Sequence, residues 1–307
     1  MGRVLMQDIS EGIITKGVGG TYTVRVSAGD VRLCQIRGGI RRKGLTPAVG
    51  DKVTIAPSGD PDIPYVLEKI HPRKNSLVRP PLANIDTLIL VFAAKDPEPD
   101  LKLLDKMLII CSTMDIMPVI VFSKEDMDKE TANDLCKVYN AAGFKTFVSN
   151  LESPVTEEEI RAITGTGLTG LAGPSGVGKS TLCNHFLGEE MMKTGDISDR
   201  LGRGKHTTRH VELFEFGDGF ITDTPGFTSL DLFELGIDYK SVVGGYPEIK
   251  ALSCGCRFDD CRHIAERDCA VREEVGKTID EGRYARYSEF CEFLYSQRNN
   301  YTGGVRR

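Results

Sequence analysis

The sequence Gly173-Pro-Ser-Gly-Val-Gly178-Lys179-Ser180 has every fixed residue of the phosphate-binding loop pattern G-x-x-x-x-G-K-[ST]. An apolar run of strand length, Gly167–Ala172, precedes it, and a helical pattern follows from Lys179. Glycines let the backbone N–H groups of such a loop turn toward phosphate oxygens, and the helix N-terminus adds its positive end. This context predicts a nucleotide site rather than a glycine-rich turn without a ligand.

Two segments are predicted to hold the phosphates and their Mg²⁺. Lys179 is expected to reach the β- and γ-phosphates, and Ser180 to bind Mg²⁺. Asp223-Thr-Pro-Gly226 ends another apolar run, where Asp223 can hold Mg²⁺ through water and the N–H of Gly226 can approach a γ-phosphate. By itself this tetrapeptide is a common turn, but downstream of a phosphate loop it indicates a second nucleotide element. The residues of the loop predicted to contact nucleotide are Gly173, Pro174, Ser175, Gly176, Val177, Gly178, Lys179, Ser180 and Thr181.

A base-reading segment is predicted upstream of the phosphate loop. GTPases usually read guanine with Asn-Lys-x-Asp after a strand, and here Ser123-Lys124-Glu125-Asp126 follows the apolar run Val119–Phe122. Asp126 can accept hydrogen bonds from guanine N1–H and N2–H₂, which adenine does not offer, and the stem of Lys124 can lie over the base. Ser123 departs from the usual Asn, and the alternative is an acidic helix start with Ser123 as its N-cap. Ser149, followed by Asn150, resembles the second guanine-contacting loop, which is usually Ser-Ala.

The segment 202–210, Gly-Arg-Gly-Lys-His-Thr-Thr-Arg-His, is predicted to be a nucleotide-dependent switch. A threonine there can bind Mg²⁺ and respond to the γ-phosphate, with Thr208 as the first choice and Thr207 as the second. Phe227 stands where Ras-type enzymes have the Gln that orients water. His206 is therefore the predicted catalytic residue that positions the attacking water, and the alternative is a solvated loop histidine.

The order of these elements predicts a circularly permuted GTPase domain with a mostly parallel sheet. Alternating strands and helices are typical of an α/β sheet covered on both faces. Strands are expected at Asp86–Ala94, Pro118–Phe122, Thr146–Ser149, Gly167–Ala172, His210–Phe216 and Phe220–Asp223, and helices at Asp100–Met114, Lys124–Ala142 and from Lys179. The guanine elements precede the phosphate elements, and a permutation keeps the pocket intact if the new chain ends lie on the surface.

The N-terminal region is predicted to be a small OB-fold β-barrel. Short alternating or β-branched runs, separated by turn residues, are expected as strands at Glu11–Lys16, Tyr22–Val26, Val31–Ile36, Asp51–Ala56 and Tyr65–Ile70. Three prolines make His71–Ala83 a linker that is not expected to be helical.

Cys256-x₄-Cys261-x-His263-x₅-Cys269 provides three thiolates and one imidazole, a closed tetrahedral set suited to structural Zn²⁺. All four ligands are protein groups, so no position remains for a catalytic water. Free thiols are the alternative, and Cys254 could replace Cys256 as a ligand. A helix is expected near Arg283–Arg298.

Composition and charge exclude secreted and membrane-spanning classes. The chain of 307 residues is 40% hydrophobic, and its longest apolar stretch, about Leu88–Ala94, is far shorter than a membrane span. Nine cysteines are too sparse for a disulfide scaffold. A cytoplasmic protein without a membrane partner is therefore expected. Its net charge is −5, yet residues 1–80 contain 13 Lys and Arg against 7 Asp and Glu, so this end can face a polyanion.

These motifs together resemble the ribosome small subunit-dependent GTPase A family (RsgA, also called YjeQ). The resemblance rests on the order of guanine motif, phosphate loop, Gly204-Lys-His-Thr-Thr208, Asp223-Thr-Pro-Gly226 and C-x₄-C-x-H-x₅-C, and it covers nearly the whole chain. The linker Pro72–Asp86 and the stretch Pro47-x-Val-Gly-Asp51 are also similar to that family.

The resemblance implies an OB-fold RNA-binding domain over 1–72, a permuted GTPase domain over 73–230 and a zinc-binding C-terminal domain over 231–307. It implies GTP hydrolysis stimulated by the small (30S) ribosomal subunit, late in the maturation of that subunit. The leading hypothesis is a GTPase checkpoint in which GTP hydrolysis releases the protein from the subunit. The resemblance also places the catalytic histidine of the family at His206, with one Zn²⁺ per chain and Mg²⁺ with GTP. A monomer that binds rRNA and GTP or GDP is expected.

The basic N-terminal region fits contact with rRNA phosphates. Tyr22 and Tyr65 are its only aromatic residues, so base stacking is poorly supplied. Contacts to backbone and shape are predicted instead, from Arg37, Arg41, Arg42 and Lys43.

Two other functions compete with a GTPase checkpoint. One is an ATPase or nucleotide kinase, which equal competition by ATP and GTP would favour. The other is a zinc-bearing RNA-binding module with a vestigial nucleotide site, against which the presence of Lys179, Ser180 and Asp223 argues.

Overall fold

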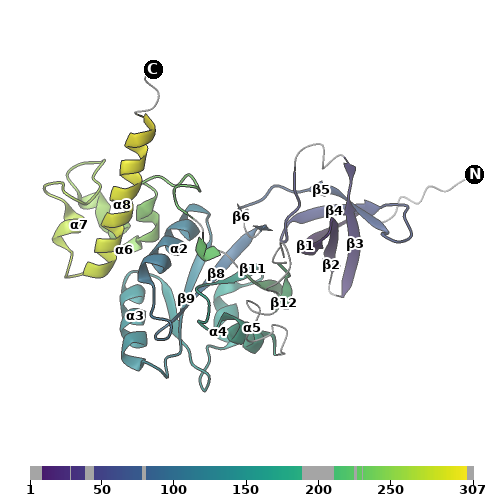
Figure 1. Cartoon of the computed structure of the whole chain (residues 1–307), viewed down its shortest axis with the longest axis horizontal. Coiled ribbons are helices and arrows are strands. Elements are labelled where there is room, and N and C mark those ends of the chain that lie inside the picture. Colours follow the sequence, from purple (N-terminus) through teal and green to yellow (C-terminus); the bar gives the residue numbers. More distant parts are fainter. Residues whose placement is uncertain are drawn as a thin grey trace, which may run out of the picture.

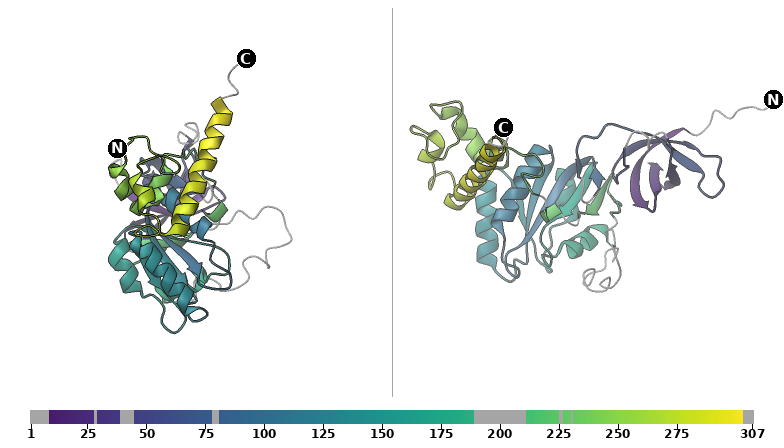
Figure 2. Two further views of the ribbon diagram at one scale, coloured as in Figure 1. Left: turned by 90° about the vertical axis from the view of Figure 1, so that its left-hand side faces the viewer. Right: turned by 45° about the horizontal axis from the view of Figure 1, so that its top comes forward.

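The computed structural model of this chain describes residues 9–27, 29–38, 45–77, 81–188, 211–224, 227–229 and 231–302, the last five of these without their side chains. The described chain forms a β-barrel, a central sheet covered by helices, and a C-terminal helical region (Figure 1). The right-hand view of Figure 2 shows the barrel and the C-terminal helices on opposite sides of the central sheet. No helix in the described part of the chain is both long and apolar enough to cross a membrane.

The N-terminal strands close into the predicted barrel. They are β1 (Ser10–Val18), β2 (Thr21–Ser27), β3 (Asp30–Ile36), β4 (Lys52–Pro57) and β5 (Tyr65–Ile70), in the order β1-β2-β3-β5-β4. Alternation along the strands buries Ile14, Val24 and Leu67 completely inside. At Gly12 an added Cβ would lie 2.5 Å from the carbonyl oxygen of Arg25, so β1 and β2 can approach closely only with glycine here.

The central sheet has the strand order β10-β9-β8-β11-β13-β12. Its strands are β8 (Ile85–Ala93), β9 (Met117–Ser123), β10 (Lys145–Val148), β11 (Leu168–Ala172), β12 (Phe214–Phe216) and β13 (Gly219–Asp223). All neighbours are parallel except β12, which runs antiparallel to β13. The chain therefore completes β8, β9 and β10 before it enters the other half of the sheet through β11, as the permuted order predicts.

Helices cover both faces of this sheet (Figure 1). Residues Leu88, Leu90 and Phe92 of β8 point into one apolar core, and Ile89 and Val91 point into the other. The four helices are α2 (Leu101–Thr113) and α3 (Lys129–Ala141) on the first face, and α4 (Glu157–Thr164) and α5 (Lys179–Leu187) on the second. A strand buried on both faces lacks a polar alternation, which is why its sequence is a continuous apolar run.

Two element boundaries differ clearly from the sequence prediction. The predicted helix Lys124–Ala142 begins only at Lys129, because the carboxylate of Asp128 caps it by accepting the Thr131 N–H at 3.0 Å. The predicted strand His210–Phe216 pairs with β13 only from Phe214, and His210 lies outside the described residues. Just before Phe214 the chain turns to the barrel instead, where the Leu213 N–H bonds to the carbonyl of Thr15 at 2.9 Å.

Helix α4 is absent from the sequence prediction, although the sequence contained a signal for it. Thr156 and Glu159 form a reciprocal capping box at its N-terminus. The Thr-x-x-Glu spacing before an apolar residue is readable without a structure.

The C-terminal region is helical, and no strand follows β13 among the described residues. It contains the short segments η1 (Phe227–Ser229), η2 (Val242–Gly245), α6 (Pro247–Leu252), η3 (Ser253–Gly255) and α7 (Ala270–Glu273), and the long α8 (Glu281–Thr302). Helix α8, drawn in yellow, lies beside the α2 face of the sheet (Figures 1 and 2). The predicted helix near Arg283–Arg298 is therefore confirmed and extended at both ends.

The linker joins the barrel to the sheet without a helix, as predicted. It forms two short strands, β6 (Ser76–Leu77) and β7 (Leu82–Ala83), which pair with each other. Arg73 crosses back to the barrel, where its Nε and Nη2 donate to the buried carboxylate of Asp51 at 2.7 and 2.8 Å. The Ala83 N–H also bonds to the carbonyl of Val49 at 2.8 Å.

Candidate nucleotide site and metal centre

The predicted nucleotide segments meet at one edge of the central sheet. Ser123 ends β9, Ser149 follows β10, Gly173 follows β11 and Asp223 ends β13. These strands are parallel, so their carboxyl ends lie at the same edge. In open α/β sheets, ligands bind outside the carboxyl ends of the strands. Segments separated by up to a hundred residues in sequence are thus brought together.

The phosphate loop has backbone conformations that require its glycines. Gly173 has φ +152°, and a Cβ there would lie 2.0 Å from the carbonyl oxygen of Val91. Gly178 has φ +91° and is the N-cap of α5, so the loop leads directly into a helix N-terminus. Val177 is buried and anchors the loop against the core of the sheet. This is the backbone arrangement that a phosphate cradle needs.

Lys179 and Asp223 form the charged part of this edge. The Lys179 ammonium donates to the Pro174 carbonyl at 2.6 Å, across its own loop. Burial lowers the pKa of Lys179, and the negative charge of Asp223 opposes that shift. Asp223 is held in place because the N–H of the next residue, Thr224, bonds to the carbonyl of Leu171 at 2.9 Å. A cation and a carboxylate therefore lie close together at the edge of the sheet where the loop 173–180 stands.

Ser123 connects the predicted base-reading segment to the loop 173–180. Its hydroxyl lies 2.6 Å from the carbonyl oxygen of Val177 and 3.3 Å from that of Phe92. A serine in place of the usual Asn thus keeps a hydrogen bond between the two segments. The alternative of Ser123 as a helix N-cap is wrong, because Ser123 is the last residue of β9 and Asp128 is the cap.

Asp126 lies at an exposed turn after β9. The turn is closed by the Met127 N–H, which bonds to the carbonyl of Lys124 at 3.0 Å, and the Lys124 ammonium contacts the carbonyl of Asp96. Ser149 is buried, and its hydroxyl accepts the N–H of Val155 at 3.2 Å. Asp126 therefore presents an accessible carboxylate beside a firmly held second loop.

Several predicted site residues lie outside the described part of the chain. They are the catalytic candidate His206, the magnesium candidates Thr207 and Thr208, the nucleotide candidate Gly226, and the RNA candidates Arg41, Arg42 and Lys43. Arg37 is described, has an exposed side chain on the barrel and pairs with Glu68.

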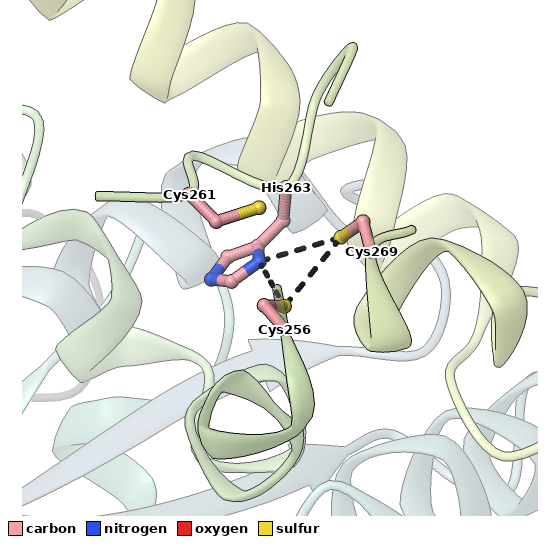
Figure 3. Close-up of side chains that lie close together, drawn as sticks. All are labelled: Cys256, Cys261, His263 and Cys269. Carbon is pink, nitrogen blue, oxygen red and sulfur yellow. Dashed lines mark hydrogen bonds between the residues drawn. The ribbon is translucent and has the colours of Figure 1, made fainter. Parts of the chain in front are cut away.

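The four predicted zinc ligands come together in the C-terminal region. The ligand atoms of Cys256, Cys261, His263 and Cys269 all lie within 4.8 Å of one another. His263 Nδ1 lies 3.4 Å from the sulfur of Cys256 and 3.5 Å from that of Cys269 (Figure 3). Burial raises the pKa of the Cys261 thiol to about 12, an effect that a bound cation would oppose, because thiolates are the ligand form. Three soft sulfurs and one imidazole fit a single tetrahedral metal ion.

Cys254 does not belong to this cluster. It is exposed on η3, and its sulfur lies 3.5 Å from the carbonyl oxygen of Ala251. The geometry therefore selects Cys256 over Cys254, a choice that sequence spacing left open.

Polar groups around the metal cluster hold its loop, and spacing alone did not reveal them. The Glu266 carboxylate accepts the backbone N–H groups of Arg262, Ile264 and Ala265 at 2.9–3.1 Å. Burial would raise the pKa of Glu266, but these hydrogen bonds outweigh it and lower the pKa to about 2. Tyr284 of α8 donates to the carbonyl of His263 at 2.7 Å. The loop is thus organised by its own carboxylate and tied to α8.

Comparisons with known proteins agree with this geometry. A family model described as RsgA GTPase matches residues 70–233, and one described as RsgA N-terminal domain matches residues 11–62. The protein named small ribosomal subunit biogenesis GTPase RsgA from Clostridium perfringens (strain 13 / Type A) is 39% identical over 293 residues, which cover 94% of this chain and all of that protein.

Two solved structures are similar over nearly their whole length. One is YloQ, described as a circularly permuted GTPase, with a TM-score of 0.77 and 30% identity over 97% of this chain and 99% of that one. The other is YjeQ from Thermotoga maritima, with a TM-score of 0.76 and 28% identity over 93% of this chain and 98% of that one.

Proposed function

This chain belongs to the RsgA GTPase family, and from that membership we propose that it is a GTP hydrolase of small ribosomal subunit maturation. The observation that carries the proposal is the meeting of the guanine and phosphate segments at one sheet edge in permuted order. The relatives are named for biogenesis of the small subunit. We assign this chain a late checkpoint role on the 30S subunit, which stimulates its hydrolysis of GTP and from which that hydrolysis releases it.

The proposed division of labour follows the three parts of the chain. Residues 1–72 would bind rRNA, with Arg37, Arg41, Arg42 and Lys43 as the proposed contact residues. Residues 73–230 would bind and hydrolyse GTP, and residues 231–307 would form the metal-binding domain. The excess of basic residues in 1–80 supports the first assignment, because phosphate contacts contribute most of the affinity in nonspecific RNA binding. We place the protein in the cytoplasm, as a monomer.

Each nucleotide-site residue has a proposed task. The loop Gly173–Thr181 would cradle the phosphates, with Lys179 on the β- and γ-phosphates, and Ser180, Thr208 and Asp223 would hold Mg²⁺. Gly226 would offer its N–H to the γ-phosphate. Asp126, Lys124 and Ser149 would bind the base, Ser123 would tie that segment to the phosphate loop, and His206 would position the attacking water. Bound Mg²⁺ would supply charge neutralisation on the phosphates.

The metal cluster has a proposed structural role with Zn²⁺. All four ligand atoms are protein groups, so a tetrahedral ion would be closed to water and substrate. Its contribution would be to hold the loop 256–269 in shape, at one ion per chain.

The decisive experiment compares GTP hydrolysis by the purified protein alone, with small ribosomal subunits and with large subunits. Groups supplied in trans accelerate other GTPases by about 10³–10⁵-fold, so strong stimulation by the small subunit alone is expected. No stimulation by small subunits, with GTP still bound, would overturn the partner assignment. Competition by ATP as strong as that by GTP would overturn the base assignment and favour the ATPase alternative.

Single-residue variants test the proposed catalytic residues independently of the ribosomal partner. Lys179→Ala is expected to abolish hydrolysis, whereas Lys137→Ala, an exposed lysine on α3, is expected to leave it unchanged. His206→Ala is expected to lower turnover by roughly 10² or more with little change in nucleotide affinity. Full activity of Lys179→Ala would remove the phosphate-loop assignment, and unchanged turnover of His206→Ala would remove its catalytic role.

A further inference from the structure

A side-chain hydrogen bond joins the two loops that border the proposed base site. The Asn150 Nδ2 group, in the loop after β10, donates to Glu125 Oε2, in the loop after β9, at 2.7 Å. The backbone N–H of Glu125 donates to the carbonyl of Ser149 at 3.2 Å, which doubles the connection. The Glu125 side chain is only 13% exposed, so water screens this contact weakly.

The orientation of the Asn150 amide follows from its other partners. Its Oδ1 accepts the backbone N–H of Glu152 at 2.9 Å and that of Ser153 at 2.6 Å. With the oxygen committed to two donors, the NH₂ group is the one that faces the carboxylate. A hydrogen bond to an ionised acceptor in this setting is stronger than a neutral one.

Glu125 directly precedes Asp126, the proposed base reader. Asp126 stands on an exposed turn that is closed by a single backbone hydrogen bond, from Met127 to Lys124. The clamp between Glu125 and Asn150 ties this turn to the second loop, and Ser123 ties it to the phosphate loop. A carboxylate that must accept two guanine N–H groups together depends on such restraint, because a displacement of about 1 Å breaks one of the two bonds.

We propose that Glu125 and Asn150 are positioning residues that set guanine selectivity, acting through Asp126 rather than by touching the base. The proposal rests on the proposed GTPase function. The pair occupies the two sequence positions that resemble the variable residue of the guanine motif and the Ala of the second loop. The proposal thus gives a role to the side chain of Asn150, which stands where Ala is usual: its amide holds Glu125.

The test measures dissociation constants for GDP, inosine diphosphate and ADP. Glu125→Ala and Asn150→Ala are each expected to weaken GDP binding about tenfold, with a smaller loss for ADP, so that selectivity falls. The double variant is expected to lose no more than either single variant, because both remove the same bond. KM for GTP should rise while kcat changes little, since the phosphate loop is untouched.

Three further variants isolate the clamp from general damage. Glu125→Gln keeps an oxygen that can accept from Asn150, so it should restore most of the GDP affinity that Glu125→Ala loses. Asn150→Asp keeps the Oδ1 acceptor for residues 152 and 153 but sets two carboxylates face to face, so it should bind GDP as weakly as Asn150→Ala. Lys129→Ala removes only the exposed lysine 3.6 Å from Glu125 and should match the unsubstituted protein.

The outcomes are distinct. Unchanged GDP affinity in both alanine variants, or strictly additive losses in the double variant, would overturn the clamp while leaving the GTPase proposal intact. An unsubstituted protein that binds ADP as well as GDP would overturn the proposed base site itself, and the clamp with it. Thermal unfolding of each variant identifies any loss of affinity that comes from a misfolded chain.

Discussion

At the scale of single residues, Ser253 determines which nitrogen of His263 is free to bind a metal ion. The Ser253 hydroxyl lies 2.9 Å from the carbonyl oxygen of Ile249, to which it donates, and 3.0 Å from His263 Nε2. Since its proton is used on the carbonyl, the hydroxyl accepts from Nε2–H, and the lone pair remains on Nδ1. That nitrogen faces the sulfurs of Cys256 and Cys269. Burial also lowers the pKa of His263, which favours the neutral ligand form.

Replacing Ser253 by alanine is expected to lower metal affinity about tenfold, because partners of ligating histidines contribute roughly that much. Competition between the protein and a chromophoric chelator for Zn²⁺ measures the change. Ser296→Ala is the matched control, since that hydroxyl is exposed on α8 and bonds only within its own helix among the contacts described. Equal zinc affinity of Ser253→Ala and the unsubstituted protein would contradict this role.

At the scale of secondary structure, a buried ionic network joins α8 to α2. Arg283 is completely buried and donates to Asp105 at 2.6 Å and to Glu248 at 2.7 Å, while Arg286 donates to Asp105 at 2.5 Å. The hydroxyls of Tyr139 and Tyr246 also donate to Asp105, at 2.8 and 3.2 Å. Two guanidinium groups are thus balanced by two carboxylates, which is the condition under which buried charge is tolerated.

Removal of one partner from this network should be costly. Arg283→Ala leaves Glu248 without its guanidinium partner and Asp105 with Arg286 alone, and it is expected to lower the free energy of unfolding by about 3–5 kcal/mol. Glu289→Ala is the control on the same helix, because it removes an exposed pair with Lys102 of α2 and should cost less than about 1 kcal/mol. Urea unfolding measures the free energy of unfolding of both variants. Equal losses would show that the buried network stabilises the protein no more than the exposed pair does.

The same elements connect the metal loop to the nucleotide edge. On α8, Tyr284 and Tyr287 donate to carbonyls of the metal loop, one residue after each of the arginines that hold Asp105. On α2, Lys106 follows Asp105 and donates to the carbonyl of Thr228, in the segment just beyond Asp223-Thr-Pro-Gly226. Helices α2 and α8 therefore link the proposed phosphate edge to the metal centre by contiguous contacts.

At the scale of the whole molecule, the buried carboxylate of Asp51 fixes the linker between barrel and sheet to the barrel. Asp51 is completely buried, and its carboxylate accepts both the guanidinium of Arg73 and the backbone N–H of Ala48 at 2.8 Å. The hydrogen bonds with Asp51 raise the pKa of Arg73, so its guanidinium stays charged at every ordinary pH. A second contact is the exposed pair of Lys16 and Glu212 at 2.7 Å.

The Arg73–Asp51 and Lys16–Glu212 pairs are expected to contribute differently to the free energy of unfolding. Arg73→Ala is expected to destabilise the protein by about 2 kcal/mol, because it leaves Asp51 without its cation, although Arg73 itself is partly exposed. Lys16→Ala should change stability by less than about 1 kcal/mol. Calorimetry measures the unfolding temperature of both variants. An unfolding temperature of Arg73→Ala that equals that of the unsubstituted protein would contradict the stabilising role of the Arg73–Asp51 pair.

Local pattern was enough for most of the fold. The five barrel strands, the central strands other than β12, and the helices α2 and α8 lie at nearly their predicted positions, because alternation and apolar runs reflect burial directly. The errors arose where a polar cap or a contact from another part of the chain decided the boundary. Asp128 capping α3 and the pairing of residue 213 with the barrel are the two clearest cases.

The sequence by itself determined the kinds of chemistry: a phosphate loop, a guanine-type motif and a Cys₃His set are each defined by residue types at close spacing, where the chain geometry is local. The tertiary structure alone decided which residues act together across the chain. The bond of Ser123 to Val177, the clamp of Asn150 on Glu125 and the choice of Cys256 over Cys254 all depend on distances between separate loops. The burial of Arg283 also depends on tertiary structure. From sequence alone, arginine is expected at the surface, and only the packing of α8 on α2 supplies the carboxylate of Asp105 that allows Arg283 to be buried.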